Sequence, residues 1–271
     1  MTILVTGATG LVGPRVLRRL TDSGIACRAL VRPGREVPEG VERAEGDLQD
    51  VAALERAVRG VSAIVHLAAV FRTRDESAIW KANLDGTKNL ITATKNVAPK
   101  ARFIMASTIN VYANDLGRPA REDDATTTET AYAASKLAAE SELRGSGLTW
   151  SVLRFPFIYG DGDGHLESTP AILAGMHMHP AQRFSVLHHQ DLANAVELAL
   201  SGAADGRVVN VAGDAPVSIY EMAQVTGGDY ETSSEPLVNP WRGQVDVSLA
   251  RSLGFRPEVL TVYQASREDR L

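Results

Sequence analysis

A glycine-rich turn near the start of the chain constrains the fold more than any other feature. The segment "TILVT" (2–6) is short, apolar and β-branched, and "TGATGLVG" (6–13) follows it with Gly7, Gly10 and Gly13 three residues apart. Glycines at this spacing allow a tight turn, let the backbone approach a pyrophosphate and seat the next helix against the strand. Because the turn lies directly between a strand and a helix, the sequence predicts a dinucleotide site at the helix N-terminus.

The chain then alternates between apolar strands and helices with an apolar face. We expect further strands at 25–31, 62–69, 102–107 and 149–155, and helices at 14–24, 49–60, 77–97 and 132–145. Strands that are apolar throughout, separated by helices, indicate a parallel sheet covered on both faces. The sequence therefore predicts a Rossmann-type, doubly wound α/β fold.

The pattern changes after residue 159. Residues 160–184 contain Gly, Pro and His with little periodicity, and a helix at 190–200, a strand at 207–213 and a capping box at 218–221 follow. We expect two parts: a dinucleotide-binding domain of residues 1–159 plus about 186–213, and a small C-terminal substrate-binding lobe of about 160–185 and 214–271.

Composition excludes several classes of partner. The chain has 271 residues and a formal net charge of −5, so neither a nucleic acid nor an anionic membrane surface is an expected partner. No segment reaches the roughly 20 apolar residues of a membrane helix. Cys27 is the only cysteine and lies in an apolar run, which is typical of a buried residue in a cytoplasmic protein.

The segment "AYAASK" (131–136) sets Tyr132 four residues before Lys136, and this spacing stacks two side chains on one helix face. A free phenol has a pKa of about 10 and exchanges protons poorly at neutral pH. A neighbouring ammonium can lower that pKa and make the phenol a general acid or base. Alternatively, the aliphatic stem of the lysine simply covers the ring on a surface helix.

Further motifs occur along the chain in a characteristic order. They are "GDL" (46–48), "HLAA" (66–69), "NLDGTKNL" (83–90), "STINVY" (107–112), "YAASK" (132–136), "RFPFIYG" (154–160), "HHQDLANAV" (188–196) and "VVNVAG" (208–213). With the glycine turn, this set resembles the extended short-chain dehydrogenase/reductases of the NAD-dependent epimerase/dehydratase family. The resemblance is dense to about residue 160 and loose in 161–186 and 222–240.

The resemblance implies catalytic roles for three residues. Tyr132 would be the general acid/base of hydride transfer, and Lys136 would hold the nicotinamide ribose and lower the phenol pKa. Thr108, four residues before the tyrosine of "VY", would hydrogen-bond the reacting oxygen, with Ser107 as the second candidate. Asn83 matches a supporting position, although it could also be a solvent-facing amide of the helix.

The same resemblance implies a set of cofactor contacts. Gly10, Leu11 and Val12 would face the pyrophosphate, Asp47 and Leu48 would flank the adenine, and Pro156 and Ile158 would line the nicotinamide carboxamide. With the remaining glycine-turn residues and the "HLAA" segment, the implied set is Gly7, Thr9, Gly10, Leu11, Val12, Gly13, Arg32, Asp47, Leu48, Leu67, Ala68, Ala69, Tyr132, Lys136, Pro156 and Ile158. Its apolar members could equally serve core packing.

The end of the second expected strand predicts the choice of cofactor. An acidic residue there would bind the ribose hydroxyls of NAD and repel a 2′-phosphate. Here Arg32 follows Val31, Arg35 lies three residues on, and no acid occurs before Glu36. A guanidinium can form two charge-assisted hydrogen bonds with a phosphate, so NADP(H) is favoured over NAD(H) unless Arg32 is merely exposed.

The histidines give no metal signal. His177 and His179 have no carboxylate at ligand spacing, and no cysteine lies with them, so we expect no metal site. His189 precedes "QDLA" and reads as structural. The roles of His165, Arg72, Arg74, Arg183 and Arg242 stay open at this point, with an anionic substrate as one option for the arginines.

Three functions remain. The first is an NADP(H)-dependent reductase or dehydrogenase acting on a small carbonyl or alcohol. The second is a nucleotide-sugar epimerase, favoured by Arg242 in "WRGQVD", which resembles a diphosphate-binding arginine. The third is a regulator that senses NADP without turnover. Sugar dehydratases carry an Asp–Glu pair where this chain has Ile109 and Asn110, so we expect no dehydration.

The resemblance also implies a homodimer. Relatives often pair through the helices at 77–97 and 132–145, which here offer Ile79, Leu90, Leu137 and Leu143 as apolar contacts unless these residues face the sheet.

Overall fold

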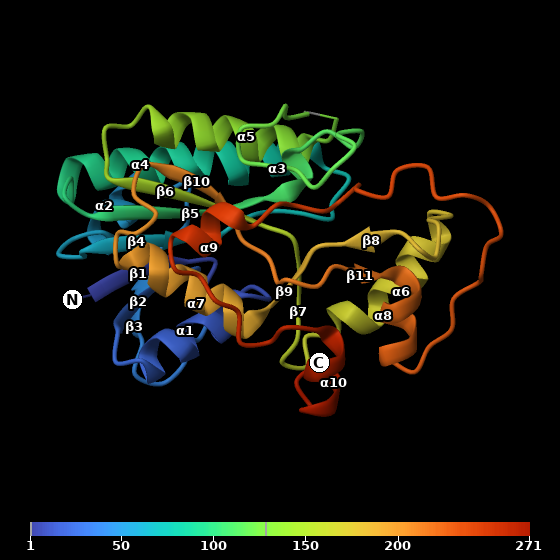
Figure 1. The fold of residues 1–271 in the computed structure, drawn as a ribbon. Coiled ribbons are helices and arrows are strands. Elements are labelled where there is room, and N and C mark those ends of the chain that lie inside the picture. Colours follow the sequence, from blue (N-terminus) through green and yellow to red (C-terminus); the bar gives the residue numbers. More distant parts are fainter. Residues whose placement is uncertain (1, 128) are drawn as a thin grey trace.

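A seven-stranded parallel sheet forms the centre of the molecule (Figure 1). It is seen in a computed structural model that describes residues 2–127 and 129–271. The strands are β1 (Thr2–Thr6), β2 (Ala26–Val31), β3 (Glu42–Glu45), β4 (Ala63–His66), β5 (Arg102–Thr108), β6 (Trp150–Phe155) and β10 (Arg207–Asn210). Their order is β10-β6-β5-β4-β1-β2-β3, so the winding direction reverses between β1 and β4. The predicted doubly wound fold is confirmed.

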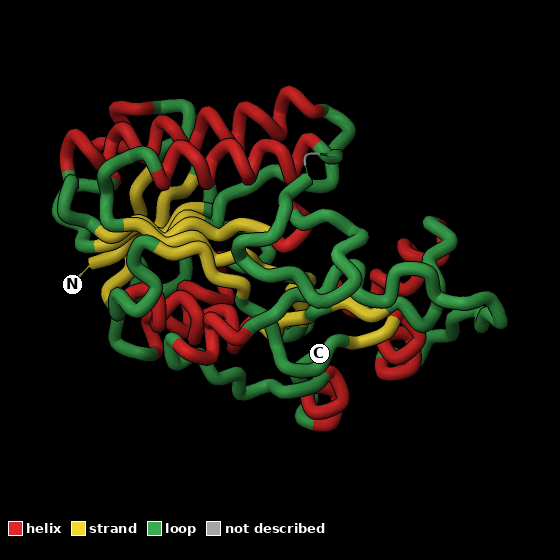
Figure 2. Tube along the Cα trace, turned by 45° about the horizontal axis from the view of Figure 1, so that its top comes forward, coloured by secondary structure: helices red, strands yellow, loops and turns green. Residues whose placement is uncertain are grey.

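Helices cover both faces of the sheet (Figures 1 and 2). On one face lie α1 (Gly13–Asp22), α7 (His189–Leu200) and α9 (Ser248–Ser252); on the other lie α2 (Val51–Ala57), α3 (Glu76–Trp80), α4 (Gly86–Val97) and α5 (Ala131–Arg144). Each face has its own apolar cluster, because helices cover the apolar strand side chains on that face. Val16 and Val196 belong to the first cluster, and Leu54 and Leu90 to the second.

Strand β3 has no counterpart among the predicted strands. Its sequence, "ERAE", is largely polar, and three of its four residues are exposed. It lies at the edge of the sheet, where it pairs with β2. An edge strand leaves one side open to water, so it does not need the apolar run on which the prediction relied.

The helix predicted at 77–97 is interrupted. A π-helical turn at Lys81–Asp85 separates α3 from α4. Single π-turns inside α-helices often occur at functional sites, because the wider turn re-aims one side chain. Here the turn contains Asn83, which is fully buried.

A smaller group of elements lies beyond the carboxyl ends of the strands. It contains β7 (Phe157–Tyr159), β8 (Arg183–Phe184), β9 (Val186–His188), β11 (Val217–Ser218), α6 (His165–Gly175), α8 (Ile219–Val225) and α10 (Val262–Arg267). The capping box predicted at Ser218 and Glu221 is present at the start of α8. Segment 160–184 is more regular than predicted, because it includes α6, whose periodicity Pro170 obscures.

One part of the predicted C-terminal lobe belongs elsewhere. The sequence predicts that residues 214–271 belong to that lobe, but segment 245–255 runs back along the sheet. Ala250 and Phe255 join the apolar cluster of α1 and α7, and Ala120 forms a bridge with Val245. The chain returns because β10 and α7 would otherwise leave an apolar surface uncovered.

The apolar contacts proposed for a homodimer are not available. Leu90 and Leu143 are buried in the cluster beneath α4 and α5, and Ile79 is also buried. Leu137 is half-buried against the Val111 cluster. These side chains face the interior of their own chain, so a homodimer stays a prediction that needs other contacts.

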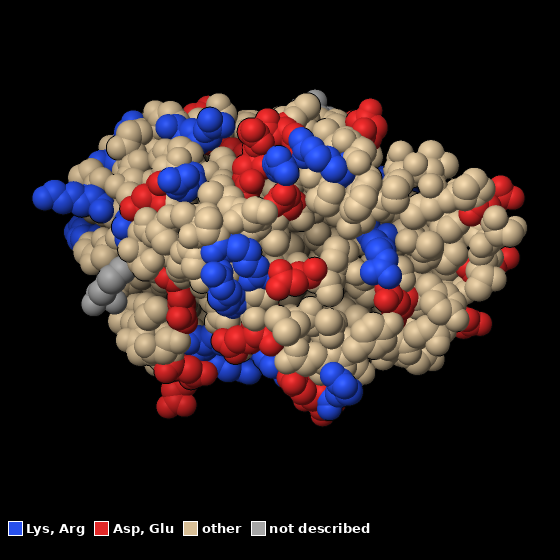
Figure 3. Space-filling model, in the orientation of Figure 1, with Lys and Arg blue, Asp and Glu red and all other residues tan. Residues whose placement is uncertain are grey.

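The surface adds two observations. On the face drawn in Figure 3, basic and acidic side chains are interspersed over the sheet region. Within the described residues, no helix combines the length and apolar character needed to cross a lipid bilayer.

Candidate active site

A cavity of about 1570 Å³ runs along the carboxyl ends of the central strands. Thr6 of β1, Val31 of β2, Thr108 of β5 and Phe155 of β6 all line it. Every residue that the sequence assigned to dinucleotide binding lines the same cavity, although these residues come from six separate segments. The reversal of strand order beside β1 leaves a crevice at this edge, which is where ligands bind in folds of this type.

The backbone of the glycine turn lies very close to other backbone atoms, both within the turn and in the segment after β4. Gly7 has φ +73°, and a Cβ atom on it would lie 2.6 Å from the amide nitrogen of Ala68. A Cβ on Gly13 would lie 2.2 Å from the carbonyl oxygen of Gly7. Among the described residues, no side chain caps the start of α1, so its first N–H groups remain available. This arrangement fits the pyrophosphate of a dinucleotide.

Arg32 and Arg35 follow β2 at the adenosine end predicted for the cavity. Both are exposed and both line the cavity. Neither guanidinium has an ion-pair partner in the described part of the chain. Two cations without a carboxylate partner fit a ligand that carries an additional phosphate there.

Tyr132 and Lys136 lie one turn apart at the start of α5, and both line the cavity. Thr130 begins the helix, and its Oγ1 accepts a hydrogen bond from Ala133 N at 3.2 Å. Burial lowers the pKa of Lys136 to about 8, partly opposed by the carboxylate of Glu140. An ammonium at this position is therefore still largely protonated at neutral pH.

The pKa of Tyr132 differs from the expectation. We expected Lys136 to lower it, whereas burial raises the pKa of Tyr132 to about 12. Removing a phenolate from water is costly, and this desolvation raises the pKa of the phenol. Tyr132 is thus held protonated at neutral pH, which suits a proton donor better than a base.

Two adjacent hydroxyls lie at the end of β5, and their hydrogen bonds distinguish them. Ser107 Oγ donates to Glu140 Oε1, so its proton is committed. Thr108 Oγ1 accepts from Asn110 N at 3.1 Å and keeps its own proton free to donate. Both residues line the cavity, and this difference favours Thr108 as the donor to a reacting oxygen.

Asn83 is a buried brace, not a solvent-facing amide. Its Oδ1 accepts from Val70 N at 2.7 Å, and its Nδ2 donates to Ser135 Oγ at 3.1 Å. Ser135 Oγ in turn donates to Tyr132 O. The π-turn therefore connects the loop after β4 to the backbone that carries Tyr132, and it fixes both walls of the cavity.

Arg154 and Glu140 form a buried ion pair next to the site, and this pair was not predicted from the sequence. The guanidinium of Arg154 contacts both carboxylate oxygens of Glu140, at 2.7 and 3.1 Å, and donates to Tyr112 Oη at 2.8 Å. Both charged side chains are almost fully buried. Glu140 lies one helical turn after Lys136, so the carboxylate also faces that ammonium, and this i, i+4 spacing was the available signal.

His66 is the last residue of β4 and is buried between two threonine side chains. Its Nδ1 lies 2.6 Å from Thr6 Oγ1 and its Nε2 lies 2.9 Å from Thr87 Oγ1. Thr87 Oγ1 donates its proton to Asn83 O, so it must accept from His66 Nε2. Thr6 then donates to Nδ1, and both ring nitrogens of a neutral imidazole are satisfied.

This neutral imidazole should make the protein sensitive to acid. Burial, helped by Lys136, lowers the pKa of His66 to about 3, whereas an exposed histidine titrates near 6.5. Between these values the unfolded chain binds a proton that the native state refuses. The contribution of His66 is therefore complete above pH 6.5 and is lost as the pH falls, by up to about 1.4 kcal/mol per pH unit.

Urea unfolding at several pH values tests this expectation. His66→Gln keeps a donor and an acceptor but cannot titrate, so its free energy of unfolding should fall less steeply below pH 6.5. Other buried groups also make the free energy of unfolding depend on pH; the raised pKa of Asp191, for example, acts in the opposite direction. Their contributions are the same in both proteins, so they cancel when the two free energies are subtracted. Parallel curves for the two proteins would contradict the assignment.

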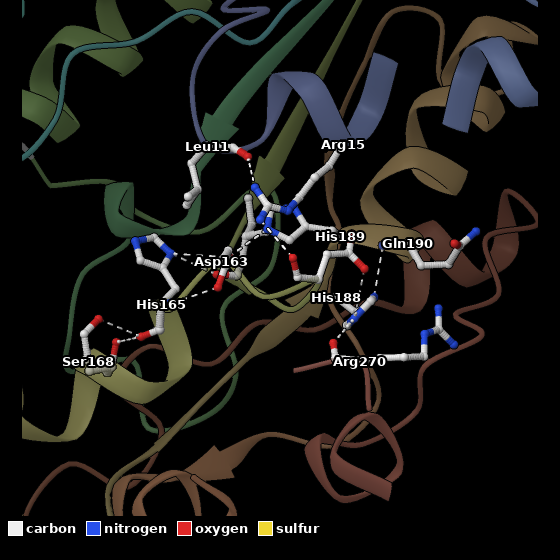
Figure 4. Close-up of polar contacts among 12 residues, drawn as sticks. Leu11, Arg15, Asp163, His165, Ser168, His188, His189, Gln190 and Arg270 are labelled. Atoms are coloured by element: carbon white, nitrogen blue, oxygen red, sulfur yellow. Dashed lines mark hydrogen bonds and ion pairs between the residues drawn. The ribbon is translucent and has the colours of Figure 1, made fainter. Parts of the chain in front are cut away.

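The other histidines mostly have structural partners (Figure 4). His189 Nε2 donates to Asp163 Oδ2 at 2.8 Å, and His188 Nε2 donates to Arg270 O at 2.9 Å. Arg15 joins the loop 160–164 to the glycine turn by donating to Leu11 O and Asp161 O. These contacts hold the loop before α6 against α1.

Residues left open by the sequence separate into two groups. His165, Arg72, Arg74 and Arg242 line the cavity. His179 Nε2 instead bonds Glu235 O, and Arg183 pairs with Glu221 outside the cavity. His177 is exposed in a turn with φ +52°. Among the described residues, no group of three or more histidine, cysteine or acidic side chains could hold a metal ion.

The sequence and the fold are similar to those of known enzymes. The chain is 30% identical over 199 residues to the ceramide reductase of Caulobacter vibrioides, covering 70% of this chain but only 58% of that protein. It is 25% identical to the D-erythronate dehydrogenase of Cupriavidus necator, covering 95% and 94% of the two chains. The UDP-glucose 4-epimerase of Thermotoga maritima shares the fold with a TM-score of 0.81 at 23% identity, over 98% and 96% of the chains.

A family model covers a longer part of the chain than the ceramide reductase match does. The model described as the NAD dependent epimerase/dehydratase family matches residues 3–212, which include β1 without Thr2, the glycine turn, α5 and β10. This match, on a sheet and a cavity of the corresponding type, shows that the chain belongs to the NAD dependent epimerase/dehydratase family.

Proposed function

We propose that this protein is an NADP(H)-dependent oxidoreductase that interconverts a carbonyl compound and its alcohol. The observation that carries the proposal is the meeting of Thr108, Tyr132 and Lys136 with the glycine turn in one cavity. The bound dinucleotide would supply or accept the hydride. The glycine turn would hold its pyrophosphate and Arg32 its 2′-phosphate.

Protonation favours the reductive direction. Tyr132 is protonated at neutral pH because burial raises its pKa to about 12. It can therefore donate a proton to the oxygen that becomes the alcohol, while the free proton of Thr108 orients that oxygen. Lys136 would hold the ribose, and its positive charge would stabilise negative charge developing nearby.

A screen with purified protein tests this function. NADPH oxidation should be stimulated by at least one class of aldehyde or ketone, with formation of the matching alcohol. If the protein binds NADPH but turns over no aldehyde, ketone or nucleotide sugar, it is a sensor of the dinucleotide and the proposal fails.

A nucleotide-sugar epimerase is the second candidate, and Arg242 is the observation in its favour. Its exposed guanidinium lines the cavity, where it could meet a diphosphate. An epimerase would invert one stereocentre of the sugar in UDP-glucose, with no net oxidation or reduction of the dinucleotide. A reductase would consume NADPH in proportion to product, so the stoichiometry separates the two functions.

We expect no dehydration of nucleotide sugars. Ile109 and Asn110 both line the cavity directly after Thr108, and neither side chain exchanges protons at neutral pH. Water elimination needs an acid and a base at the sugar ring. Mass spectrometry of a nucleotide hexose after incubation checks this, since loss of one water would contradict it.

Cofactor preference gives a further prediction. Arg32 and Arg35 line the cavity and lack ion-pair partners among the described residues, so NADP(H) should bind at least about 10-fold more tightly than NAD(H). Arg32→Asp should reverse the preference because a carboxylate repels a 2′-phosphate and accepts from free hydroxyls. Titration with both cofactors measures the ratio.

Arg59→Asp provides a matched control, because Arg59 is exposed but lies outside the cavity. It should leave the ratio unchanged if the effect of Arg32 is local. Equal affinities of the wild-type protein for the two cofactors would refute the assignment.

A further inference from the structure

The cavity has two chemically different ends. At the end formed by β7, α6 and their neighbours, large apolar side chains dominate the lining, namely Phe157, Leu173, Met176, Met178, Phe184 and Met222. These six side chains are all apolar, whereas the amides of Asn110 and Asn114 also line the cavity. The glycine-turn end, in contrast, presents backbone N–H groups and arginines.

The few polar side chains at the apolar end are largely engaged. Thr169 Oγ1 donates to His165 O at 2.7 Å, and Ser185 Oγ accepts from Val245 N at 3.1 Å. His165 Nδ1 lies 3.1 Å from Ile158 O, so it donates there and leaves only Nε2 as an acceptor. Its ring also stacks on Phe157, at 5.4 Å between centroids.

An aromatic wall stands beside the proposed proton donor. The ring centroid of Phe71 lies 4.4 Å from that of Tyr132, and the ring is 52% exposed. The guanidinium of Arg72 lies over the Phe71 ring, 5.6 Å from its centroid. A substrate whose oxygen meets the Tyr132 hydroxyl must place a neighbouring group close to Phe71.

Met176 is also exposed, at 61%, and it lines the same cavity. Apolar side chains left in water inside a concave site gain free energy when a ligand covers them. Methionine side chains are flexible, so they can adapt to ligands of different shape. We define the apolar seat as Phe71, Leu173, Met176, Met178 and Met222.

We propose that the substrate carries an apolar substituent, alkyl or aryl, on its reacting carbonyl carbon, and that the apolar seat binds this substituent. The inference rests on the proposed function and narrows its substrate class. A nucleotide sugar would bring a base, two phosphates and several hydroxyls to an end whose lining is largely apolar, with the guanidinium groups of Arg72 and Arg242 as cations. Polar groups buried there without partners would weaken binding.

The binding of inert probes tests the seat without turnover. Straight-chain carboxamides from butanamide to octanamide present a carbonyl that does not accept hydride. With saturating dinucleotide, their Kd should fall about fourfold per added methylene, and the heat-capacity change of binding should become more negative. A Kd independent of chain length, or tighter binding of UDP-glucose than of octanamide, overturns the proposal.

Variants locate the effect. Phe71→Ala and Met176→Ala should each weaken octanamide binding several-fold while butanamide binding changes less, and Phe71→Leu should keep most of the affinity. Ile172→Ala is the matched control, because Ile172 is 49% exposed on the same helix α6 as Leu173 but lies outside the cavity. An equal loss in the Ile172 variant would contradict the seat.

The experiment separates the two proposals. Length-dependent amide binding without reduction of any carbonyl compound would reject the proposed function and keep the seat. Reduction of short and long aldehydes with equal kcat/KM would keep the function and reject the seat.

Discussion

Replacing Tyr132 by phenylalanine is expected to lower turnover by at least about 100-fold, as is typical for the loss of a general acid. The substitution removes one hydroxyl and keeps the ring, so the contact with Phe71 at 4.4 Å should persist. Cofactor affinity should barely change. Steady-state reduction of the substrate found in the screen, with fluorescence titration of NADPH, measures both quantities.

A second substitution distinguishes chemistry from binding. Lys136→Ala should reduce turnover and also weaken binding of the dinucleotide, because Lys136 lines the cavity and is expected to hold the ribose. Near-normal rates in Tyr132→Phe would show that another group supplies the proton and would reject the proposed role.

Breaking the buried ion pair should have the largest effect on stability. Arg154 and Glu140 expose only 4% and 3% of their side chains. Glu140→Gln leaves the guanidinium of Arg154 and the ammonium of Lys136 buried without a neutralising carboxylate. Removal of one partner from such a pair typically costs about 3–5 kcal/mol, which is a large part of the usual stability of a domain. Urea unfolding at neutral pH measures the loss.

Two comparisons make this result specific. The double variant Glu140→Leu with Arg154→Met removes both charges, so it should recover much of the loss caused by Glu140→Gln. Arg118 and Asp124 form a similar pair at the surface, where Arg118→Met should cost less than about 1 kcal/mol. Equal losses in the buried and the exposed pair would show that burial is not the cause.

Much of the fold could be predicted because the patterns are local. Strands such as Thr2–Thr6 are buried on both faces, and their apolar runs indicate this directly. The edge strand Glu42–Glu45 and helix α6 lack such a pattern, because one is open to water and the other carries Pro170. Their existence depends on neighbours that the local sequence does not specify.

The sequence by itself determined the residue types of the candidate site. The glycine spacing, the four-residue interval between Tyr132 and Lys136, and the arginines after β2 are all readable without coordinates. They are readable because backbone approach, helix periodicity and strand ends follow from local geometry.

The tertiary structure decided the environments. Burial holds Tyr132 protonated. Glu140 accepts the hydrogen bond of the Ser107 hydroxyl, whereas the Thr108 hydroxyl stays free to donate, and a π-turn buries the amide of Asn83. It also placed Phe71 beside Tyr132. Desolvation and hydrogen-bond partners depend on segments far apart in the chain, so only packing could settle them.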